Sequence, residues 1–153
     1  MDHWIAGFQG LGLAMACGAL LGGVGLRGRA AWVLGVVAAV AGAYLFGLSL
    51  TKDFGVAEIA DSGHPAWPGW IAGAVFAAFS YYAWLAVATG ARKRAGQAVL
   101  GVSLFIGLFA LVVAGLSLFV PFIGAAMFLF TAWIWFGRRR RDSQKHQGLR
   151  VLK

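Results

Sequence analysis

The chain has 153 residues, of which 61% are hydrophobic and 12% are charged, and its formal net charge is +8. An average soluble domain carries roughly 25% charged residues, so a chain of this size could not cover its apolar side chains in water. The composition therefore excludes an ordinary soluble domain and predicts an integral membrane protein folded as one domain.

The placement of the basic residues excludes a nucleic-acid-binding surface. Lys and Arg gather in short segments between apolar stretches, whereas nucleic-acid-binding domains carry them on a folded basic face. The lone cysteine, Cys17, excludes an intrachain disulfide and a redox thiol pair. The first apolar stretch is too long for a signal-peptide core and lacks a basic segment before it, so we expect it to remain as a membrane helix.

Charge-free stretches predict five transmembrane helices. A helix needs about 20 apolar residues to cross a bilayer, and the first three predicted helices cover residues 4–26, 30–50 and 69–89. The stretch 97–137 would form a helix roughly 60 Å long, which is too long for one crossing. Because Pro121 favours the first turn of a helix, we expect a fourth helix at 97–118, a tight apolar turn and a fifth helix at 121–137. The predicted fold class is an all-α membrane bundle.

The charges predict the orientation of this bundle. If the N-terminus lies outside, all but one of the thirteen Lys and Arg residues fall on the inside, and the exception is Lys52. Lys and Arg mark the cytoplasmic side of membrane proteins. We therefore predict an outside N-terminus, a transmembrane domain over residues 1–137 and a basic cytoplasmic tail over residues 138–153. Trp residues are expected near both membrane boundaries: Trp4, Trp67 and Trp70 outside, and Trp32, Trp133 and Trp135 inside.

Small residues recur at every fourth position on the first two predicted helices. The first row is Gly10, Ala14, Gly18 and Gly22, and the second row is Gly35, Ala39, Ala43 and Gly47. Such rows let another helix backbone approach closely. We interpret them as packing sites within the bundle, with the docking of another protein or an identical subunit as the alternative. Gly12 lies off the first row and is expected to tolerate leucine better than Gly18 does.

Polar residues within the apolar stretches are few and uncharged. Candidates for a polar pocket or pore wall are Gln9, Ser80, Tyr81 and Tyr82, although such groups more often form hydrogen bonds between helices. Ionisable residues at depth normally mark proton relays and substrate paths, and the five stretches contain none. A haem would also need an axial ligand such as histidine. We therefore predict that the chain is not an enzyme and carries no cofactor.

The connection between the second and third predicted helices holds Glu58, Asp61 and His64. Their spacing would align them on one face of a short helix, and carboxylate and imidazole groups can ligate a divalent metal. Gly63 and Pro65 interrupt any helix there. We interpret the segment as a solvated or interfacial loop without a tight metal site; partner docking and a metal or substrate site are the alternatives.

These features predict a small multi-pass protein of a cell membrane, and the Gly-, Ala- and Arg-rich composition favours a bacterial inner membrane. The predicted function is that of a non-catalytic accessory or structural subunit that packs against other membrane proteins. The alternative is an oligomeric channel, a holin-like pore or a carrier for an uncharged or lipidic solute. Expected partners are anionic lipid headgroups at Arg138 to Arg141, together with another membrane protein or further copies of the chain.

Overall fold

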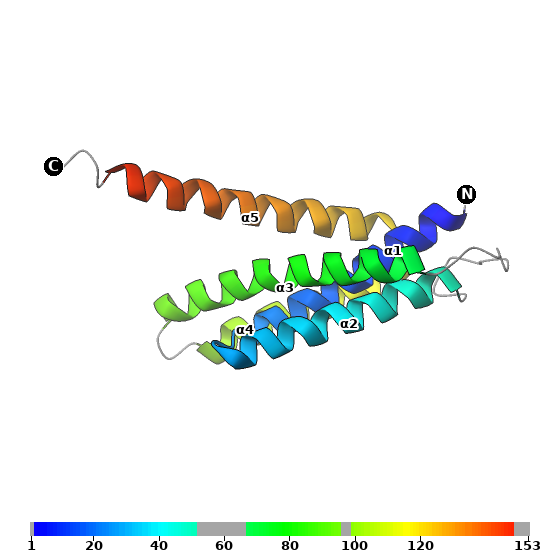
Figure 1. Ribbon diagram of the computed structural model, residues 1–153, viewed down its shortest axis with the longest axis horizontal. Helices are drawn as coiled ribbons and strands as arrows, with labels where there is room; N and C mark the ends of the chain where they lie inside the picture. Colours follow the sequence, from blue (N-terminus) through cyan, green and yellow to red (C-terminus); the bar gives the residue numbers. More distant parts are fainter. Residues whose placement is uncertain (1, 52–66, 96–98, 149–153) are drawn as a thin grey trace.

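In the computed structural model, the described residues form an antiparallel bundle of five helices (Figure 1). The structure describes residues 2–51, 67–95 and 99–148. The helices are α1 (Asp2–Gly23), α2 (Arg29–Thr51), α3 (Trp67–Ala95), α4 (Val99–Phe119) and α5 (Phe122–Gly148). The prediction of an all-helical chain with five helices is confirmed for these ranges.

Four helices of the described ranges are long and apolar enough to cross a membrane. Their candidate spans are Trp4–Gly23, Arg29–Thr51, Trp67–Arg94 and Leu100–Phe119. The fifth helix is not among them, because its charge-free part ends at Gly137. At about 1.5 Å per residue that part is roughly 24 Å long, which is shorter than a hydrocarbon core of about 30 Å. The fold is thus compatible with a multi-pass membrane protein.

Three helix ends differ from the predicted boundaries. Helix α1 ends at Gly23 rather than near residue 26, because the chain turns through Gly25 and Gly28 with φ values of 62° and 68°. Helix α3 continues to Ala95, and its last turn carries Arg92, Lys93 and Arg94, where cations interact favourably with the helix dipole. Helix α5 continues past residue 137 because arginine is a good helix former. The predicted tail therefore begins as part of α5.

The long charge-free stretch folds back where the sequence predicts it. The last turn of α4 is extended by a hydrogen bond from the Val120 nitrogen to the Leu116 oxygen (2.8 Å). The next turn starts with bonds from the Ile123 nitrogen to the Val120 oxygen and from the Gly124 nitrogen to the Pro121 oxygen, both 3.1 Å. Proline fits there because the first turn of a helix has no acceptor for its missing N–H group.

Helix α1 is the centre of the bundle and contacts all four other helices. Inside the protein, 56% of its apolar stretch is buried, compared with 22% for α4. The main apolar core therefore gathers around α1, from four helices: Met15, Ala16, Ala19, Trp84, Ala88, Ile106, Ala110, Val113 and Met127.

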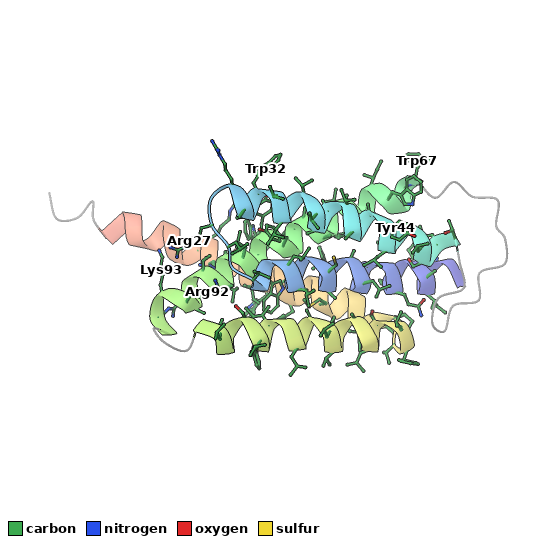
Figure 2. The ribbon with its side chains drawn as sticks, turned by 90° about the horizontal axis from the view of Figure 1, so that it is seen from below. Arg27, Trp32, Tyr44, Trp67, Arg92 and Lys93 are labelled. Carbon is green, nitrogen blue, oxygen red and sulfur yellow. The ribbon has the colours of Figure 1, made fainter. Side chains whose placement is uncertain are left out.

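The basic residues of the described ranges gather toward one end of the bundle. This end holds the connection between α1 and α2, the end of α3 and the C-terminal part of α5 (Figure 1). Exposed Trp residues lie toward both ends: Figure 2 places Trp32 at the basic end and Trp67 at the opposite end. We call the first of these the basic end.

Candidate functional site

Two small residues of the α1 row bring its backbone against α3. A Cβ atom at Gly18 would lie 2.8 Å from the Ser80 Cβ atom and 2.9 Å from the Tyr81 nitrogen. A Cβ atom at Gly22 would lie 3.0 Å from the Leu85 nitrogen. Because real Cβ atoms essentially never come closer than 3.0 Å to such atoms, a larger residue at Gly18 would push α1 and α3 apart.

The other two members of the α1 row face α2. A Cβ atom at Gly10 would lie 3.1 Å from the Phe46 ring. Ala14 is fully buried and packs with Phe46 and Ala77. The row therefore divides between two neighbouring helices.

The α2 row meets aromatic side chains of α3. It consists of Gly35, Ala39, Ala43 and Gly47. A Cβ atom at Gly35 would lie 3.1 Å from the Tyr81 ring, and one at Gly47 would collide with the Trp70 indole. The two alanines are half-buried, so the glycines of this row are the places where α3 fits most tightly against it.

Two close backbone contacts lie outside the predicted rows. A Cβ atom at Gly42 of α2 would lie 2.8 Å from the Gly73 oxygen of α3. A Cβ atom at Gly124 of α5 would lie 2.8 Å from the Gly12 nitrogen, and one at Gly12 would lie 2.5 Å from the Ser117 Cβ atom. The expectation that Gly12 tolerates leucine is therefore wrong, because α4 and α5 pack against the side of α1 that the row leaves out.

The candidate polar residues do not share one pocket. Three of them donate hydrogen bonds to backbone carbonyls of other helices: Gln9 to Leu118 (2.8 Å), Ser80 to Met15 (2.6 Å) and Tyr81 to Ala31. Tyr82 is 46% exposed and lies in the groove described below. The first three thus connect pairs of helices at separate places in the bundle.

The candidate site in the α2–α3 connection is not placed by the structure, since Glu58, Asp61 and His64 lie outside the described residues. Within the described ranges, no three His, Cys, Asp or Glu side chains gather where they could hold a metal ion.

At the basic end, Arg92 of α3 joins two other parts of the bundle. Its guanidinium group donates to the Gly25 oxygen (3.2 Å) and to the Ser103 Oγ atom of α4 (2.6 Å). A Cβ atom at Gly25 would lie 3.0 Å from the Arg92 Cζ atom, so this approach requires glycine. Both acceptors are uncharged, and they hold the guanidinium group in place without neutralising it.

Arg92 also lines an open cleft of about 530 Å³, which we call the charged cleft. Its lining residues are Gly25, Leu26, Arg27, Arg92 and Lys93. Figure 2 shows Arg27, Arg92 and Lys93 together at the basic end. Since three of the lining residues are cationic and none is acidic, the cleft is positively charged.

A second open cleft of about 410 Å³ adjoins the charged cleft and shares Leu26 and Arg27 with it. We call it the apolar groove, and it lies between the start of α2, the middle of α3 and α5. Its other lining residues are Gly28, Ala31, Tyr82, Leu85, Ala86, Thr89 and Trp135. The groove is therefore mainly apolar below its charged end.

Two arginines of α5 contact the neighbourhood of the apolar groove. Arg138 donates a 2.6 Å hydrogen bond to the Ala86 oxygen of α3. A Cβ atom at Gly90 would lie 3.3 Å from an Arg138 nitrogen, so the small residue leaves room for this bond. Arg139 lies over the Trp135 ring, with 5.8 Å between its Cζ atom and the ring centroid. These contacts attach the C-terminal half of α5 to the basic end.

No protein-family model, curated protein or solved structure matches this chain. The functional argument therefore depends on the geometry of the chain itself.

The charged cleft is the functional feature that sequence reasoning missed. Arg27, Arg92 and Lys93 are clear in the sequence, where they indicate membrane orientation. Nothing in their spacing shows that the α1–α2 connection and the end of α3 close around one cleft. With its apolar neighbour, this cleft offers a binding site for an anion rather than a catalytic arrangement.

Proposed function

We propose that this chain is a non-catalytic accessory or structural subunit that packs against other proteins of a cell membrane, with a bacterial inner membrane favoured by its composition. In this proposal all five helices cross the membrane, and the N-terminus lies outside. The proposal is supported by the sorting of the basic residues to one end and by the charge-free spans.

The observation that carries this proposal is the contrast between the inner and outer glycines. Glycines of α1, such as Gly18, meet backbone atoms of neighbouring helices, whereas a Cβ atom at Gly101, Gly107 or Gly115 of α4 would meet nothing within 4 Å. Exposed apolar side chains flank two of these glycines on the outer face of α4: Leu104, Phe105, Leu108 and Val112. Open glycines on an apolar face suit the close approach of another membrane helix.

Native mass spectrometry of the chain extracted from its own membrane in a mild detergent tests this proposal. We expect a heteromeric particle. Replacing both Gly101 and Gly115 with leucine should leave the chain folded and reduce the fraction in that particle by about tenfold. Gly7→Leu is the matched control, because a Cβ atom there also meets nothing within 4 Å. A monomer in every preparation contradicts the proposal.

The alternative of an oligomeric channel, holin-like pore or carrier has one feature in its favour, the apolar groove with its Tyr82 and Thr89 hydroxyls. Because α1 occupies the centre of the bundle, a conducting path would have to lie between copies of the chain. A ring of identical chains in the same mass measurement, together with solute flux in proteoliposomes, would favour this alternative.

A further inference from the structure

The charged cleft and the apolar groove together match an amphipathic anion. The charged cleft presents Arg27, Arg92 and Lys93, and the groove presents apolar surface from residues such as Leu85 and Ala86. The two share Leu26 and Arg27, so one molecule can occupy both. A soluble anion would use the charged cleft alone and leave the groove unfilled.

We propose that the charged cleft and the apolar groove bind one anionic phospholipid, with its phosphate in the cleft and an acyl chain in the groove. Basic pockets between transmembrane helices are suited to anionic headgroups, and guanidinium groups match the geometry of phosphate oxygens. This inference does not depend on the proposed function, because it concerns a different surface from the outer face of α4.

Arg92 is prepared for such a ligand before it binds. Its bonds to the Gly25 oxygen and the Ser103 hydroxyl hold the guanidinium group, yet both partners are neutral. A phosphate in the charged cleft supplies the negative charge that these partners lack. Little side-chain order has to be gained on binding at this position, which favours affinity.

The position of the groove favours a lipid as the source of the phosphate. Trp135 lines the groove, and the exposed Trp32 lies at the same end of the bundle (Figure 2). Trp side chains concentrate at the level of the lipid headgroups. The charged cleft therefore lies at headgroup level, and the groove leads from it along α3 toward the level of the acyl chains.

Lipid binding to the full-length chain in delipidated detergent micelles tests this inference by native mass spectrometry. Phosphatidylglycerol should bind at one molecule per chain, about tenfold more tightly than phosphatidylcholine with the same acyl chains. The double variant Arg27→Gln/Lys93→Gln should lose this preference. Its control is Arg29→Gln/Arg94→Gln, which removes the same charge from exposed residues outside both clefts and should keep the preference.

The acyl chain is tested without any change of charge. Ala31 lines the groove and its exposed neighbour Ala30 does not, so Ala31→Phe should weaken phosphatidylglycerol binding by about tenfold while Ala30→Phe leaves it unchanged. Equal losses in the two charge variants would indicate diffuse attraction and overturn the proposal. Displacement of the lipid by a tenfold excess of inorganic phosphate would reduce the site to an anion site and also overturn it. If the charge variants do not fold, undiminished binding to Ala31→Phe overturns it.

Discussion

One guanidinium group connects three parts of the bundle at the basic end. Arg92 extends from α3 to the backbone of the α1–α2 connection and to the hydroxyl of Ser103 on α4. Hydrogen bonds from charged donors contribute roughly 1.5–3 kcal/mol each. The two glycines of the connection, Gly25 and Gly28, both have positive φ values, but the Arg92 side chain approaches Gly25 and leaves Gly28 open.

This difference makes Gly25→Ala and Gly28→Ala a matched pair. Gly28→Ala should lower the free energy of unfolding by about 1 kcal/mol, because alanine is strained at positive φ. Gly25→Ala should lower it by about 2 kcal/mol or more, because the new methyl group also displaces Arg92. Denaturant unfolding in detergent micelles, followed by circular dichroism, measures both. In an Arg92→Ala background the two variants should become equal; equal losses in the unchanged background would show that the contact has no energetic value.

At the level of the helices, the sequence predicts existence better than packing. The charge-free stretches and Pro121 place five helices and the turn between α4 and α5. The faces of the helices are harder to predict, because lipid and protein core are both apolar and no polar stripe marks the outside. The α1 row was read as one surface, but α1 lies among four neighbours, so Gly10 and Gly18 face different helices and Gly12 faces a third side.

The contact between Gly12 and Gly124 predicts how α5 is attached to the bundle. Gly124→Leu should destabilise the protein by roughly 1–3 kcal/mol, because overpacking forces α5 away from α1. Gly137→Leu on the same helix should be nearly neutral, since a Cβ atom there meets nothing within 4 Å. Thermal denaturation of both variants in the same detergent compares them, and an equal loss for Gly137→Leu would contradict this account of the packing.

For the whole molecule, the charge-free spans and the basic end could be predicted from composition and charge sorting. The charged cleft could not, because it depends on how the α1–α2 connection packs against the end of α3. The same limit applies to Gln9, Ser80 and Tyr81, which the sequence groups as polar but the structure uses in three separate helix pairs.

Cysteine labelling tests the proposed orientation of the whole molecule. Single cysteines at Ser62 and Ser143, in a Cys17→Ala background, are exposed to a membrane-impermeant reagent in intact cells. Ser62 should react because it precedes α3 on the predicted outer side, and Ser143 should not because it follows the arginine run of α5. Permeabilised cells, in which both positions should react, provide the control. Equal reactivity in intact cells would contradict a five-span chain with its ends on opposite sides.

The bond between Arg138 and the Ala86 oxygen fixes the vertical position of α5 against α3. From that point the charge-free part of α5 extends roughly 24 Å, about 6 Å less than a typical hydrocarbon core. A bilayer that covers the longer helices must therefore become thinner beside α5 or leave lipid tails in contact with water. Such mismatch sorts proteins between membranes of different thickness. We expect this bundle to be a local thinning element that is better folded in lipids with shorter acyl chains, so that its lipid surroundings are asymmetric around the axis of the bundle.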